Sequence, residues 1–151
     1  MCQIRSRHWL VQQLVLFSLN PATTFNEYCM AKILIIEDSL TNMKLTSFLV
    51  KIFGHIAICT TDAEIGLVLV YDELPDLILM DIQLPGMDGW TATTLLKQDV
   101  RTASIPIIAY MALASEIDHK KCIAAGCAAC IAKPVNYKEL TAVIARHLVI
   151  V

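Results

Sequence analysis

Five short apolar segments recur along the chain from residue 32 onward. Each is four to six residues long, which is too short for a typical helix, and together they are rich in isoleucine and leucine. Such runs, bounded by polar residues, glycine or proline, favour β-strands. The predicted strands lie at residues 32–36, 55–60, 76–80, 105–110 and 129–132.

The segments between these strands have apolar residues at helical spacing. Ser39 and Asp88 can cap two of the expected helices, and Gly126 is placed to end a third. The last helix has Asn136 and Glu139 at capping-box spacing. The expected helices span about 40–53, 63–71, 89–98 and 115–125, followed by one beginning after residue 136. The predicted apolar faces are Leu45, Phe48, Leu49 and Ile52 in the first helix and Leu140, Val143, Ile144 and Leu148 in the last.

This alternation predicts an α/β fold with a five-stranded parallel sheet and helices on both faces, because right-handed crossovers place helices on each side. Strands that are covered on both faces would also account for the hydrophobic fraction of 56%. We expect one domain over residues 31–151, with no linker or second domain after it.

Residues 1–30 differ from the rest and are interpreted as an N-terminal extension. Their apolar run, "WLVQQLVLFSL", is shorter than the roughly 20 residues needed to span a bilayer, so no stable membrane insertion is expected. A start-site artefact with Met30 as the natural start, an amphipathic leader and export remain open, in that order of preference.

Charge and cysteine content exclude some classes of function. A formal charge of −2 and a pI near 6.0 argue against nucleic-acid binding. Six cysteines are too few for a disulfide scaffold, and we expect reduced thiols in a cytoplasmic protein. The C-x-x-C spacing of Cys127 and Cys130, with Cys122 nearby, could indicate zinc or redox chemistry, but small apolar filling of the core is the preferred interpretation.

Candidate chemistry lies at the predicted strand ends. Glu37 and Asp38 follow the first strand, and Asp81 follows the third; in strand order 2-1-3-4-5 these two strands are neighbours. Three converging carboxylates would repel and raise at least one pKa, and oxygen ligands of this kind favour Mg²⁺. Lys133, after the fifth strand, could contact a phosphoryl oxygen. This combination suits phosphoryl transfer with Asp81 as the nucleophile.

The segments "ILIIEDS", "DLILMDIQLPGMDG", "IPIIAYMA" and "AKP" resemble, in order and spacing, the response-regulator receiver domain of two-component signalling. The resemblance covers residues 32 to about 148 and implies a flavodoxin-like fold. It implies Asp81 as phosphoacceptor, Glu37 and Asp38 as the acidic pair around Mg²⁺, the backbone carbonyl of Gln83 as a further metal ligand, and Lys133 as the phosphoryl contact.

Two positions depart from the family pattern. Met111 stands where receivers usually have Thr or Ser, and Cys130 stands where they often have Tyr or Phe. A thioether cannot donate the hydrogen bond that a hydroxyl would give to a phosphoryl oxygen. The chemistry can therefore survive while the usual coupling to the output face is lost.

These residues and motifs are compatible with three functions. The first is a stand-alone receiver, not an enzyme beyond its own phosphorylation and dephosphorylation, that accepts phosphate from a sensor histidine kinase or histidine phosphotransfer protein and signals to a downstream protein target. The second is a degenerate receiver that acts as a phosphorylation-independent interaction module. The third, a flavodoxin-like cofactor binder, is disfavoured because the acids of "EDSLTN" would repel a nucleotide phosphate.

Overall fold

The computed structural model of the protein describes residues 30–112 and 115–148. The N-terminal extension was predicted to span residues 1–30, and all of it except Met30 lies outside the described residues. Strands and helices alternate strictly along the described chain. The strands are β1 (Lys32–Ile36), β2 (Ile56–Thr60), β3 (Leu77–Asp81), β4 (Ile107–Met111) and β5 (Ala129–Ala132). The helices are α2 (Leu40–Ile52), α3 (Ala63–Glu73), α4 (Gly89–Gln98), α5 (Glu116–Ala125) and α6 (Tyr137–His147).

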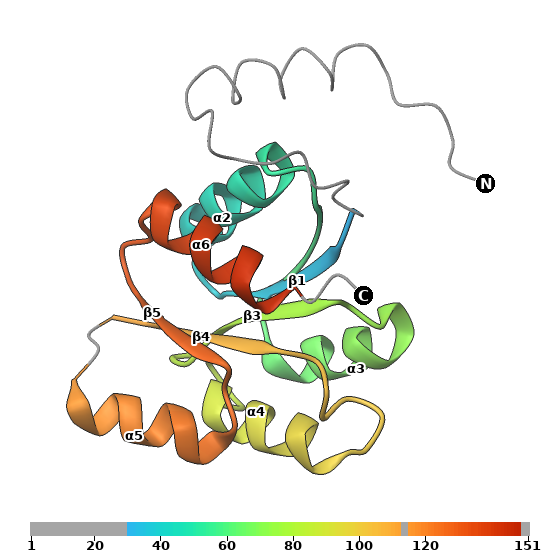
Figure 1. Ribbon diagram of the computed structural model, residues 1–151. Helices are drawn as coiled ribbons and strands as arrows, with labels where there is room; N and C mark the ends of the chain where they lie inside the picture. Colours follow the sequence, from blue (N-terminus) through green and yellow to red (C-terminus); the bar gives the residue numbers. More distant parts are fainter. Residues whose placement is uncertain (1–29, 113–114, 149–151) are drawn as a thin grey trace.

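The five strands form one parallel sheet in the order β2-β1-β3-β4-β5, as predicted. Helices α2 and α6 cover one face, and α3, α4 and α5 cover the other (Figure 1). β3 and β4 are buried along their whole length because both faces are covered. Among the described residues, no helix is long and apolar enough to cross a membrane.

Most predicted helix ends are confirmed. Ser39 and Asp88 accept hydrogen bonds from the third residue of their helices, at 3.4 Å from Asn42 and 2.9 Å from Thr91. Gly126 ends α5 in the left-handed conformation, with φ of +90°. Such caps satisfy backbone groups that have no partner within the helix. The apolar face predicted for the last helix is also confirmed, because Leu140, Val143, Ile144 and Leu148 contribute to the core beneath α6.

The face predicted for the first helix is wrong except at Leu49, which packs against the core. Phe48 and Leu45 of α2 are 60% and 47% exposed, whereas Thr46 and Val50 are buried. Apolar residues occur on several sides of α2, so their spacing alone does not identify the side that packs. The crossover from β1 to β2 fixes the orientation of α2 and turns Val50 towards the sheet.

Candidate functional site

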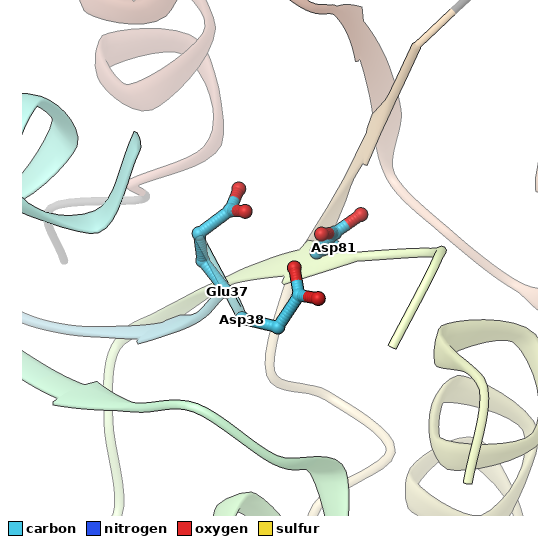
Figure 2. Close-up of side chains that lie close together, drawn as sticks. All are labelled: Glu37, Asp38 and Asp81. Carbon is cyan, nitrogen blue, oxygen red and sulfur yellow. The ribbon is translucent and has the colours of Figure 1, made fainter. Parts of the chain in front are cut away.

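Three carboxylates meet at the carboxyl ends of β1 and β3. Glu37 and Asp38 directly follow β1. Asp81 is the last residue of β3, because this strand ends one residue later than predicted. The two strands are adjacent, with Ile36 opposite Met80. The three side chains point towards one another (Figure 2), and one oxygen of each lies within 4.8 Å of the other two. Parallel pairing of neighbouring strands therefore creates the acidic cluster.

Lys133 reaches this cluster from the end of β5, although β4 separates β5 from β3. Its backbone N–H donates to the carbonyl of Met111 at 2.7 Å, which holds the residue at the sheet edge. Its Nζ lies 2.8 Å from Asp81 Oδ2 and 2.8 Å from Glu37 Oε2. One ammonium thus bridges two of the three carboxylates and leaves the cluster with excess negative charge.

Backbone amides orient the two carboxylates that Lys133 contacts. Asp81 Oδ1 accepts a hydrogen bond of 3.0 Å from the N–H of Gln83. Glu37 Oε1 accepts one of 3.1 Å from the N–H of Ser39 and a longer one, 3.4 Å, from the side chain of Asn42. These loop contacts limit the rotation of side chains that would otherwise repel each other.

Burial and hydrogen bonding shift the pKa values of Asp81 and Lys133. Burial raises the pKa of Asp81, which is 2% exposed, while the hydrogen bonds from Lys133 and Gln83 oppose this and the charge of Glu37 adds to it. The pKa of one carboxylate of the cluster, that of Asp81, is therefore raised as predicted. Its main cause is burial, and repulsion by the neighbouring carboxylate is a smaller one. Burial lowers the pKa of Lys133, yet its hydrogen bonds to Asp81 and Glu37 outweigh this effect, so the net shift is upward. The lysine therefore carries its charge at neutral pH.

The acidic cluster is chemically suited to a hard divalent cation. It offers carboxylate oxygens only, and Mg²⁺ prefers such ligands while retaining several waters. Asp38 is exposed and has no hydrogen bond to Lys133, so its carboxylate can take a ligand without breaking an ion pair. Gln83 is also exposed, two residues beyond Asp81, where its backbone carbonyl is the predicted further ligand.

The two unusual positions lie on strands that flank the site. Met111 ends β4 and is 4% exposed, packed in the core beneath α3, α4 and α5. Cys130, in β5, forms a disulfide with Cys122 of α5. The prediction of reduced thiols is therefore wrong for these two cysteines, whereas their predicted role in filling the core is confirmed, because Cys122 is buried in the core and Cys130 packs against it. The C-x-x-C pattern drew attention to Cys127, which is free, whereas the return from α5 to β5 brings Cys122 to 6.8 Å from Cys130 between Cα atoms.

Sequence reasoning missed Tyr110, which adjoins the cluster. A small cavity of about 10 Å³ is lined by Tyr110, Thr46, Glu37 and Asp81, together with apolar side chains of β1 and β3. Burial raises the pKa of Tyr110 to about 12, so the phenol stays protonated at neutral pH. A tyrosine at the end of an otherwise aliphatic strand was the available signal, because its hydroxyl needs a polar surrounding.

Comparison with known proteins places this fold and site in one class. The family model of the response regulator receiver domain matches residues 33–145, which is most of the chain. The chain therefore belongs to the response regulator receiver domain family, as its motifs predicted.

Its relatives include response regulators that it matches over nearly their whole length. It is 38% identical over 116 residues to the polar-differentiation response regulator DivK of Brucella anthropi and to that of Brucella ovis, covering 77% of this chain and 94% of each relative. Among solved structures, a putative response regulator from Chloroflexus aurantiacus aligns with a TM-score of 0.77 at 26% identity, over 80% of this chain and 98% of that one.

A further solved structure bears on the acidic site. The receiver domain of a sensor histidine kinase from Pseudomonas aeruginosa PAO1 aligns with a TM-score of 0.74 at 28% identity, over 80% of this chain and 98% of that one. That structure is described with a magnesium ion coordinated in its active site cleft.

Proposed function

We propose that this protein is a phosphoryl-accepting response regulator in which Asp81 is the acceptor. The observation that carries the proposal is the convergence of Asp81, Glu37 and Asp38 with the ammonium of Lys133. In this reaction an Asp81 carboxylate oxygen forms a bond to phosphorus as the bond from phosphorus to a histidine nitrogen of the donor breaks. The product is an acyl phosphate on Asp81, and the donor histidine leaves in its neutral form after taking up a proton.

The residues of the site divide the work of this transfer. The N–H of Gln83 and the ammonium of Lys133 hold the Asp81 carboxylate in place. As the phosphoryl group arrives, Lys133 exchanges its contact with Asp81 for one with a phosphoryl oxygen, so its charge stays compensated. Glu37, Asp38, Asp81 and the carbonyl of Gln83 would hold Mg²⁺, which neutralises charge on the phosphoryl oxygens when bound.

The proposed partners follow from this role. The donor is a sensor histidine kinase or a histidine phosphotransfer protein acting in the cytoplasm, and the output passes to a downstream protein target. Turnover of an external substrate is not part of the proposal, because the chemistry is confined to phosphorylation and dephosphorylation of Asp81 itself. The family match and the relatives named above support these assignments.

The test uses acetyl phosphate, which replaces the histidine donor. The purified protein is incubated with acetyl phosphate and Mg²⁺, and intact-mass spectrometry is expected to detect an adduct of about 80 Da. Asp81→Asn should abolish the adduct because an amide is a poor nucleophile. Asp88→Asn is the matched control: Asp88 lies in the following loop, is exposed and caps α4, and asparagine caps equally well. An adduct that persists in Asp81→Asn would contradict the proposal.

A second candidate is a receiver-derived interaction module that works without phosphorylation. The buried thioether of Met111 and the disulfide of Cys130 favour it, because neither can act as the hydroxyl or the mobile aromatic ring of the usual switch. The intact acidic cluster and Lys133 favour the first candidate. Binding to an isolated partner with equal affinity before and after treatment with acetyl phosphate would identify the second.

A further inference from the structure

Tyr110 of β4 lies directly behind the acidic cluster. It pairs with Asp81 in the sheet, and its carbonyl accepts a hydrogen bond of 3.0 Å from the N–H of Ile82. Its side chain is 4% exposed and packs on the face covered by α2 and α6, opposite to the face that buries Met111. The backbone that carries Asp81 therefore fixes the position of the ring.

The ring lies close to the ammonium that bridges the carboxylates. Lys133 Nζ is 5.9 Å from the centroid of the Tyr110 ring, within the range of a cation–π contact. Among the groups that the structure describes, none meets the distance and angle limits for a hydrogen bond to the Tyr110 hydroxyl, although the Thr46 side chain lies near enough to lower the pKa of the phenol against the effect of burial. It belongs to the lining of the cavity that also contains Glu37 and Thr46, a space at the lower limit for one water molecule. The Tyr110 side chain therefore lies close to both Lys133 and Glu37.

We propose that Tyr110 is a positioning residue for Lys133, acting through its aromatic ring; this inference rests on the proposed function. Lysine has a flexible four-carbon stem and a compact charge, so two carboxylates alone leave its ammonium several similar positions. A ring on one side attracts the cation electrostatically and removes the positions on that side by steric exclusion. Lys133 is then held where an incoming phosphoryl oxygen can take over its contact with Asp81.

The first test observes Lys133 without phosphorylation or metal. In magnesium-free protein, NMR should detect an NOE between the Tyr110 ring protons and the Hε protons of Lys133, together with a slowly exchanging Nζ signal for this lysine. Tyr110→Phe keeps the ring and should keep both signals. Tyr110→Leu removes the ring, and the Nζ signal of Lys133 should broaden to resemble those of exposed lysines.

The second test measures phosphorylation by acetyl phosphate. Tyr110→Leu should lower the initial rate about tenfold, whereas Tyr110→Phe should stay within about twofold of the unaltered protein. Ile108→Ala is the matched control for a core defect, because Ile108 lies two residues earlier on the same face of β4, opposite Ala129 of β5. It should leave both the Lys133 signal and the rate nearly unchanged.

Three results would overturn this role for the ring. They are the absence of the NOE in the unaltered protein, an unchanged Lys133 signal in Tyr110→Leu, and an equal loss of rate in Tyr110→Phe and Tyr110→Leu. If Tyr110→Leu does not fold, the role of the ring is still tested by the NOE in the unaltered protein and by the phosphorylation rate of Tyr110→Phe. Because the NMR measurement needs no phosphoryl donor, it remains informative if Asp81 proves not to be the acceptor.

Discussion

Gly89, the first residue of α4, lies against the backbone that carries Asp81. A Cβ at this position would overlap the carbonyl oxygen of Asp81 and lie 2.8 Å from Cα of Ile82. The N–H of Gly89 also donates to the carbonyl of Ile82 at 3.0 Å. The start of α4 can therefore approach the end of β3 only with glycine at position 89.

Gly89→Ala is expected to destabilise the protein by about 2 kcal/mol, the usual scale for forcing extra volume into a packed site. Urea unfolding measures the difference. Gly66→Ala is the comparison for a side-chain clash, because its added Cβ would meet the side chain of Ile36 and no backbone atom, so it should destabilise the protein less than Gly89→Ala. Equal stability of the two variants would show that the approach of α4 to β3 does not require glycine.

The missing hydroxyl at Met111 can be restored with one substitution. Met111→Thr should increase the initial rate of phosphorylation roughly ten- to hundredfold, since a hydrogen bond to a charged group is worth about 1.5–3 kcal/mol. It should also lower the free energy of unfolding by about 1–3 kcal/mol, because Met111 is buried and threonine fills less space. Acetyl phosphate kinetics and urea unfolding measure the two effects.

Met111→Val serves as the reference for this substitution. Valine has nearly the shape of threonine and lacks the hydroxyl, so it should reproduce the loss of stability without the gain in rate. The same phosphorylation rate in both variants would show that a hydroxyl at position 111 does not reach the phosphoryl group.

Among the elements, α5 and β5 are joined by the Cys122–Cys130 disulfide, which closes a loop with a sequence separation of 8. Reduction should lower the free energy of unfolding by about 2 kcal/mol, because the unfolded chain regains the entropy that the closed loop had removed. A peptide containing both cysteines should be cross-linked in a non-reducing digest and separate after treatment with dithiothreitol.

Cysteine variants separate this effect from general thiol chemistry. Cys130→Ser should show the lower stability without reductant and should no longer respond to it. Cys59→Ser alters an exposed free cysteine and should behave like the unaltered protein. Full alkylation of Cys122 and Cys130 without prior reduction would contradict the bond.

Helix α2 shows where prediction of elements from the sequence stops. Its extent and its cap at Ser39 followed from local signals, which depend on neighbouring residues only. Its buried side did not, because Phe48 and Val50 are both apolar and only the packing of α2 on the sheet distinguishes them. By contrast, α6 has polar residues opposite its apolar stripe, so its buried face could be predicted from spacing alone.

For the molecule as a whole, the acidic cluster should couple metal binding to folding. Mg²⁺ is expected to raise the melting temperature, since a ligand present at 100 times its Kd stabilises the folded state by about 2.7 kcal/mol. Asp38→Asn should reduce the shift, because Asp38 supplies a carboxylate that Lys133 does not contact. Asp88→Asn should retain it, and an equal shift in both variants would place the metal elsewhere.

The order of strands and helices, the family and the acidic residues of the candidate site could all be predicted from the amino-acid sequence. These features rest on local periodicity and on motifs whose spacing along the chain reflects strand ends. It also identified the hydroxyl and aromatic positions that Met111 and Cys130 occupy.

Beyond the predicted carboxylates, the side chains that meet across the sheet became known from the packing of the folded chain. The pairing of β4 with β3 brings Tyr110 beside Asp81, and the return from α5 brings Cys122 to Cys130. The sequence predicted that Lys133 belongs to the site, and its ion pairs with Glu37 and Asp81 form because β5 pairs with β4 and the lysine side chain spans the remaining gap. These contacts depend on residues far apart in the chain, whose separations are set by packing and by no local pattern.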